Sequence, residues 1–266
     1  MQTIFGAAFM DVVDELWRFP KWTQSPGEEL ANTISHGMGL LAALIGTPVL
    51  LFAALDAGSD GFFVGTIIFA LTMLVLYLGS TLYHAWPQTR AKCVLQVFDH
   101  SAIFLLIAGT YTPFTLGPLR GVWGWTMFGL IWALAIFGVI MKATRATSYH
   151  PKLGLTLYLG MGWLALIAIR PLTAAVPRPA LFWLVAGGIA YTTGVLFFVN
   201  KRRYAHFVWH LFVLIGTGCH FLALLACTQG ELGIKKEKNC GFRIAESRPT
   251  GLKTENRKSG TGIISD

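Results

Sequence analysis

Charged residues are scarce in this 266-residue chain. Asp, Glu, Lys and Arg make up 13% of it, about half of the roughly 25% that is typical of soluble domains. The mean hydropathy is +0.58. This composition argues against a soluble globular domain. It also excludes disorder over most of the chain, because disordered segments combine low hydrophobicity with high charge.

Cysteine is scarce as well, with four residues and no C-x-x-C pair, which excludes a disulfide framework and a zinc ribbon. The net charge of +8 is the one property that could indicate nucleic acid. However, eight of the 21 Lys and Arg residues lie after residue 230, and most of the others form short clusters between apolar runs. We therefore predict no nucleic-acid partner.

Seven stretches contain no charged residue at all. They are residues 30–55, 61–89, 100–119, 121–141, 153–169, 179–200 and 204–230. Each is close to the ~17–25 residues that a helix needs to cross ~30 Å of hydrocarbon, and backbone groups in lipid must be satisfied within the helix. A soluble helical core would instead need polar outer faces. The sequence predicts an all-α fold, a seven-transmembrane helix bundle.

Basic residues between the stretches predict how the bundle is oriented. If the N-terminus is inside, the inside segments carry 10 Lys and Arg residues and the outside loops carry 3. Cytoplasmic loops are enriched in Lys and Arg, so we predict a cytoplasmic N-terminus. The pair Arg170-Pro171, directly after the short fifth stretch, is expected to mark the outer interface.

Three regions follow from this pattern. Residues 1–29 are predicted to be a cytoplasmic segment, in which apolar residues from Ile4 to Trp17 could form an amphipathic helix. Residues 30–230 are the seven-helix membrane domain. Residues 231–266 are polar and are predicted to be a disordered tail. With seven spans this tail lies outside despite its basic residues, because long segments translocate largely regardless of charge.

Asp99 is the one acidic residue between Asp60 and Glu231, and it stands at the start of the predicted third span. Two interpretations are open. Asp is a good helix N-cap, so the residue could simply begin a helix. Ionisable residues within membrane spans are otherwise functional by default.

Six of the seven histidines lie in or at the predicted spans. Under the predicted topology five of them share the cytoplasmic leaflet with Asp99, and they come from four helices: His36, His84, His100, His206 and His210. At 1.5 Å per residue, His220 lies about 15 Å further along the last span. His150 lies in a loop.

His206 and His210 are four residues apart and so share one helical face. Such a pair alone is weak support for a metal site, but His84 lies at the same depth on another helix. Three neutral imidazoles suit Zn²⁺ and leave a fourth position for water. Asp99 is the one carboxylate deep enough to offset the charge and to act as base or orienter. Ser80, one turn before His84, could orient a ligand or water.

Other polar residues have open roles. Glu29 and Asn32 either support the metal ligands from outside or merely begin the first span. His36 and His100 are candidates for the same supporting role. A two-histidine haem site, which pairs His36 or His100 with His210, is an alternative to zinc.

Four segments together resemble the haemolysin III family, within the progestin and adiponectin receptor superfamily. They are ELANTISHG at 29–37, STLYH at 80–84, FDHSAIFLLIAGTYTPF at 98–114 and HFVWH at 206–210. The resemblance runs from about residue 17 to 227. It implies seven helices with a cytoplasmic N-terminus, zinc held by His84, His206 and His210, and motif roles for Ser80 and Asp99. The tail after residue 230 departs from the family, whose members tend to stop near the end of the seventh span.

The resemblance also implies a function and a location. Relatives are linked to ceramidase-like amide hydrolysis and to membrane lipid or energetics homeostasis, so membrane lipids are the expected partners. A zinc-dependent lipid amide or ester hydrolase in the bacterial cell membrane is therefore the first hypothesis. A receptor-like signalling protein with structural zinc and a membrane-damaging haemolysin are the alternatives. A pore should show polar stripes along its spans, and none is visible.

Overall fold

The computed structural model describes residues 24–144 and 151–246, and every regular element in these two ranges is helical. The elements are α2 (Pro26–Ala57), α3 (Asp60–Ala85), α4 (Arg90–Leu116), α5 (Val122–Ala143), α7 (Pro151–Trp163), the 3₁₀-helix η1 (Leu164–Ala168), α8 (Ile169–Ala175), α9 (Arg178–Phe198) and α10 (Ala205–Glu246). Within these two ranges, seven helical segments are long and apolar enough to cross a membrane. The predicted seven-helix membrane fold is thereby confirmed.

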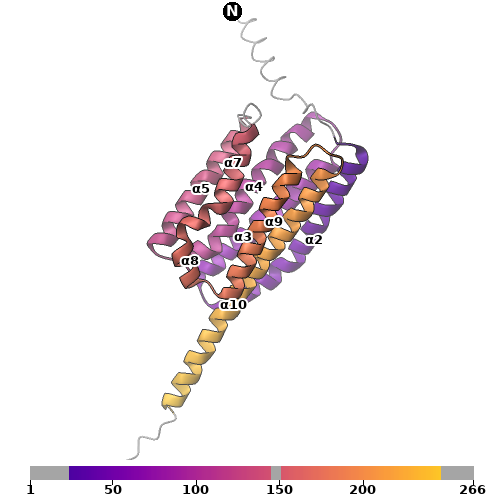
Figure 1. The fold of residues 1–266 in the computed structure, drawn as a ribbon. Helices are drawn as coiled ribbons and strands as arrows, with labels where there is room; N and C mark the ends of the chain where they lie inside the picture. The colour runs from indigo at the N-terminus through magenta and orange to yellow at the C-terminus, as the bar shows by residue number, and fades with distance from the viewer. Residues whose placement is uncertain (1–23, 145–150, 247–266) are drawn as a thin grey trace, which may run out of the picture.

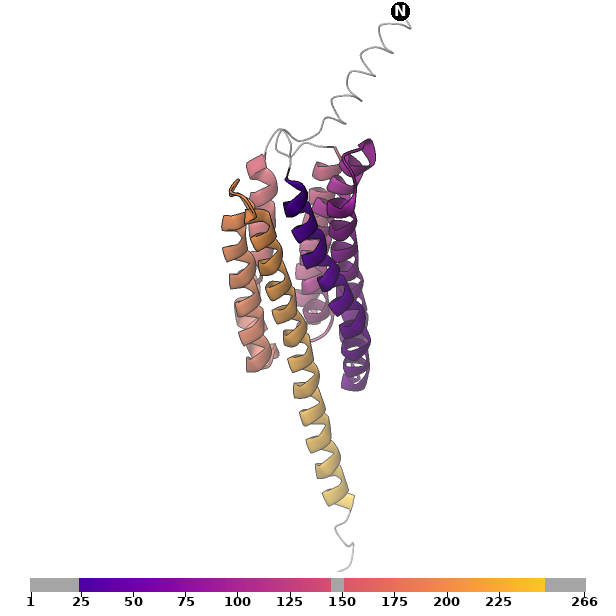
Figure 2. The ribbon, with the colours of Figure 1, turned by 90° about the vertical axis from the view of Figure 1, so that its right-hand side faces the viewer.

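The helices lie side by side along one bundle (Figure 1), and the contacts between neighbours in sequence close into a ring. Each of α2, α3, α4 and α5 packs closely against the next one in this order. Close packing also joins α9 to α10 and α10 to α2. The fifth span, formed by α7, η1 and α8, packs more sparsely, against α4, α5 and α9. The helices α2 and α10 therefore lie side by side, and both begin at the same end of the bundle (Figure 2).

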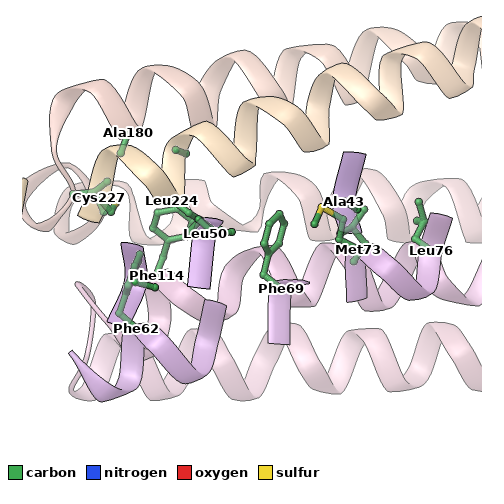
Figure 3. Close-up of a cluster of buried hydrophobic side chains, with 14 of the residues drawn as sticks. Ala43, Leu50, Phe62, Phe69, Met73, Leu76, Phe114, Ala180, Leu224 and Cys227 are labelled. Carbon is green, nitrogen blue, oxygen red and sulfur yellow. The ribbon is translucent and has the colours of Figure 1, made fainter. Parts of the chain in front are cut away.

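A cluster of large apolar side chains fills the space between these helices (Figure 3). Phe62, Phe69 and Met73 of α3 are almost fully buried in it, together with Leu50 of α2 and Leu224 of α10. Many other large apolar side chains point outward and are exposed. Lipid tails are as apolar as these side chains, so association of the helices rests on close packing rather than on removal from water.

Gly65 lies at a close approach of α3 to α4, which makes it sensitive to added volume. A methyl group there would lie 2.5 Å from the Pro113 Cα and 2.7 Å from its nitrogen, both backbone atoms that cannot turn away. We expect Gly65→Ala to destabilise the bundle by about 1–3 kcal/mol, the usual cost of overpacking, measured as thermal melting in detergent. The matched control is Gly129→Ala, where nothing lies within 4 Å. Equal melting temperatures for the two variants would contradict this account of the interface.

The regular α-helix of the fifth span is interrupted by η1, and the Tyr111 hydroxyl binds backbone groups at the interruption. Pro171 has no backbone N–H, and its ring clashes with the carbonyl group four residues earlier in a regular α-helix. That residue is Ile167, which lies in η1. The Tyr111 hydroxyl accepts a hydrogen bond from the Ala165 backbone N–H at 2.9 Å, and it lies 2.9 Å and 3.0 Å from the carbonyl oxygens of Met161 and Gly162. Backbone groups freed inside a membrane need such partners.

Several predicted boundaries differ from the structure. The third span begins at Arg90 rather than at residue 100. The fifth continues past the Arg170-Pro171 pair to Ala175, so this pair does not end the span. The last helix runs to Glu246, past the predicted start of the tail at 231, whereas its apolar span ends at Gln229, next to the predicted end of the membrane domain at 230. The predicted amphipathic helix at 4–17 and the end of the tail, 247–266, lie outside the described residues.

Candidate metal centre

Three histidines meet where α3 ends and α10 begins. His84 lies in the last turn of α3, His206 in the first turn of α10, and His210 one turn later. One ring nitrogen from each can be chosen so that all lie within 4.8 Å of one another. The ring centroids are 5.3 Å apart for His84 and His206, 5.0 Å for His84 and His210, and 4.7 Å for His206 and His210. The three histidines singled out from the sequence are therefore brought together.

Glu29 fixes which nitrogen of His84 faces its neighbours. The Nδ1 of His84 lies 2.7 Å from the Glu29 Oε2, so Nδ1 carries the proton that the carboxylate accepts. The other nitrogen, Nε2, is buried and has no hydrogen-bond partner. A carboxylate behind a metal-binding histidine is a recurrent arrangement that sets the tautomer and raises the basicity of the ligand nitrogen.

Ser35 fixes which nitrogen of His210 carries the proton. Its hydroxyl donates a hydrogen bond to the Asn32 carbonyl at 2.8 Å, which leaves its lone pairs as acceptors. The His210 Nδ1 lies 3.1 Å from that oxygen, so Nδ1 donates and Nε2 keeps its lone pair. Two neutral imidazoles with directed lone pairs, and His206 within the same group, fit Zn²⁺. The Nε2 of His84 is buried and has no hydrogen-bond partner. Buried polar atoms are nearly always satisfied, so this nitrogen is suited to bind a ligand such as a metal ion.

Asp99 and Ser80 lie beside the three histidines. Asp99 is 7% exposed and lies well inside α4, which begins at Arg90, so it does not cap the helix. A methyl group at Gly79 would come within 3.9 Å of the Asp99 Cα, which shows how closely α3 approaches α4 here. The Ser80 hydroxyl is buried next to Asp99 and lacks a hydrogen bond of good geometry.

A cavity of about 290 Å³ borders this cluster at one end. His36, Ser80, Asp99, His206 and His210 line that end. Most of the remaining wall consists of apolar side chains from the third to the seventh span, including Leu106, Ile107, Leu172, Leu184 and Val213. A cavity with a few convergent polar groups and an otherwise apolar wall is the usual form of a site for an apolar ligand.

The other histidines have different surroundings. His36 stacks flat on His210, with ring centroids 3.6 Å apart and 8° between the planes. Two rings stacked face to face cannot bind one haem iron from opposite sides, so this pair is not a haem site. His100 lines the cavity, His220 packs against Gly187, and His150 lies outside the described residues.

Glu28, next to Glu29, supports the site in a way that the sequence did not reveal. Its Oε1 accepts a hydrogen bond from the Tyr204 backbone N–H at 2.9 Å, and its Oε2 accepts from the Ser25 amide and hydroxyl. Tyr204 has a φ of 59°, a costly conformation for a residue with a side chain. The spacing of Ser25 and Glu28 is a capping-box signal, but the contact with Tyr204, two residues before His206, is long-range.

Comparison with known proteins shows which family has this sequence. A sequence model of the family described as "Haemolysin-III related" matches residues 24–221. The chain belongs to the haemolysin III family. The matched segment contains every residue of the candidate centre, and the resemblance predicted from the four motifs is confirmed.

Two bacterial relatives and a human one share most of the chain. The Hemolysin-3 homolog of Bacillus subtilis is 41% identical over 199 residues, which cover 74% of this chain and 93% of the relative. Hemolysin-3 of Bacillus cereus is 39% identical over 78% of this chain and 95% of its own length. The monocyte to macrophage differentiation factor of Homo sapiens is 28% identical over 74% of this chain and 83% of its own length. No solved structure matches the chain.

Proposed function

We propose that this haemolysin III protein resides in the bacterial cell membrane and hydrolyses an amide or ester bond of a membrane lipid, in lipid or energetics homeostasis. The observation that carries the proposal is the meeting of three histidine ligand atoms within 4.8 Å at one end of a largely apolar cavity. An acyl chain fits the apolar wall, and the bond to be cleaved would then lie beside Asp99.

His84 and His210 would hold Zn²⁺ through their Nε2 atoms, and His206 would hold it through one of its ring nitrogens. When bound, the ion would supply a Lewis acid and lower the pKa of a coordinated water. Asp99 would accept a proton as general base, a role worth roughly 10²–10⁴ in rate. Ser80, on the same side as Asp99, would orient the substrate by a hydrogen bond from its otherwise unsatisfied hydroxyl.

The end of the bundle that carries the histidines would face the cytoplasm. Arg90 and the run Lys201–Arg203 flank that end, whereas Arg120 and Arg178 flank the other and Arg170 lies within α8. This asymmetry supports the orientation because cytoplasmic loops are enriched in Lys and Arg. The bacterial relatives support a location in the cell membrane.

Removal and return of the metal tests the proposal directly. Purified protein in lipid nanodiscs is incubated with a mixture of ceramides and ester lipids, and released fatty acid is measured by mass spectrometry. We expect product from the zinc-loaded protein, little or none after chelation, and recovery when Zn²⁺ is returned. Product that is absent from the loaded protein, or that is unchanged by chelation, would reject hydrolysis by this centre.

The name of the Bacillus cereus relative, Hemolysin-3, favours membrane damage as a second candidate. Lysis of red cells that persists unchanged in His84→Ala would favour it over zinc-dependent hydrolysis. The apolar wall of the cavity argues against an aqueous pore, because a conducting pore needs polar side chains along its length.

A further inference from the structure

Lys92 is a buried cation in the first turns of α4, and its surroundings are unusual for a lysine. The residue is 5% exposed. Its Nζ lies 2.9 Å from the Glu29 Oε1, donates a hydrogen bond to the Trp86 carbonyl at 3.0 Å, and sits 5.0 Å from the centre of the Tyr83 ring. Taking a lysine out of water is costly unless its charge is paired and hydrogen-bonded, and here both conditions are met.

Glu29 is held from two sides. One carboxylate oxygen accepts from the His84 Nδ1 at 2.7 Å, and the other pairs with Lys92 at 2.9 Å. The Glu29 side chain is 16% exposed and lies in the first turn of α2, so the carboxylate without Lys92 has water within reach. Three helices thus contribute to one chain of contacts that ends at the buried Nε2 of His84.

We propose that Lys92 is a positioning residue for the metal centre and acts through Glu29. By holding Oε1, it keeps Oε2 on the His84 Nδ1, and this in turn keeps Nε2 directed at His206 and His210. Among the described residues, the polar partners of Lys92 are Glu29 and the Trp86 carbonyl rather than any of the three histidines. The inference rests on the proposed zinc site and adds to it the residue that sets the affinity of the site.

The proposal predicts a specific pattern in a double-mutant cycle. Metal affinity is measured on the full-length protein in detergent, by competition of Zn²⁺ with a chromophoric chelator, and needs no activity. Glu29→Gln should weaken binding about 10- to 100-fold, the usual effect of losing a partner behind a ligand. Lys92→Met should weaken it in the same range. Because the two residues act in series, the double variant should bind no more weakly than the weaker single variant.

Controls separate a positioning role from a general effect on folding. Lys201→Met removes an exposed lysine at the same end of the bundle and should leave the affinity unchanged. Lys92→Arg keeps the cation and should bind Zn²⁺ more tightly than Lys92→Met. Should Lys92→Met alone fail to fold, the double variant Glu29→Gln/Lys92→Met, which leaves neither charge unpaired, is compared with Glu29→Gln. The two should then bind Zn²⁺ with equal affinity.

The possible outcomes are distinct. If wild-type protein binds Zn²⁺ but Lys92→Met binds it equally well, the inference about Lys92 is wrong and the zinc site stands. If the effects of the two substitutions multiply, Lys92 acts independently of Glu29 and the inference is again wrong. If wild-type protein binds no Zn²⁺, the proposed function itself fails.

Discussion

Purified His84→Ala protein should contain almost no zinc, whereas wild-type protein should contain about one ion per chain. His84 is the one ligand that comes from α3, and it is buried with its Nε2 unpartnered. Two histidines on α10 cannot replace it. Loss of a supporting group alone costs roughly 10- to 100-fold in affinity, so loss of a ligand should cost more than about 100-fold. His206→Ala should behave in the same way. Metal content is measured by mass spectrometry after gel filtration.

The His84→Ala variant should still fold, which makes the metal measurement interpretable. Glu29 loses one partner but keeps its ion pair with Lys92 at 2.9 Å, so no buried carboxylate is left unpaired. The matched control is His220→Gln, a change on α10 at a residue outside the three-histidine group. It should retain the full zinc content. Full zinc content in His84→Ala would end the assignment of this centre.

Charge-free stretches predicted the number of spans because lipid excludes unpaired charges. The same logic misplaced the start of the third span by ten residues, at 100 instead of Arg90. Lys92 and Asp99 lie between the predicted second and third spans, but the structure places both in α4, where Lys92 pairs with Glu29 and Asp99 lines a cavity. A charge that is paired or faces a polar site is compatible with a span, and pairing between helices is not visible in a single sequence.

The ligand histidines of the candidate centre were predictable from the sequence, but the groups that support them were not. The spacing of His206 and His210 and the depth of His84 are properties of the sequence. The supporting groups behind them come from other helices. Ser35 reaches His210 across 175 positions of sequence, and Glu28 reaches Tyr204 across 176. Only the packing of α2 against α10 brings these pairs together, so local patterns leave Ser35 and Glu28 unnoticed.

Asp99→Asn should abolish most of the hydrolysis while leaving zinc in place. The amide has nearly the same shape but cannot accept a proton as a base, and general base catalysis contributes roughly 10²–10⁴ in rate. Asp99 is outside the three-histidine group, so zinc content should stay near one ion per chain. The rate is measured as fatty acid released per minute under saturating lipid. Ser80→Ala should lower the rate less, because a hydroxyl that only orients the substrate takes no part in proton transfer.

The matched control for this variant is Asp60→Asn, the same chemical change in an exposed carboxylate at the opposite end of α3. It should keep the wild-type rate. The decisive comparison is between rate and metal content in one preparation. A loss of rate with retained zinc assigns Asp99 to the chemistry. A parallel loss of both would instead make Asp99 a residue that holds the ion in place, since its carboxylate would then be needed to offset the charge of the metal in a low-dielectric site.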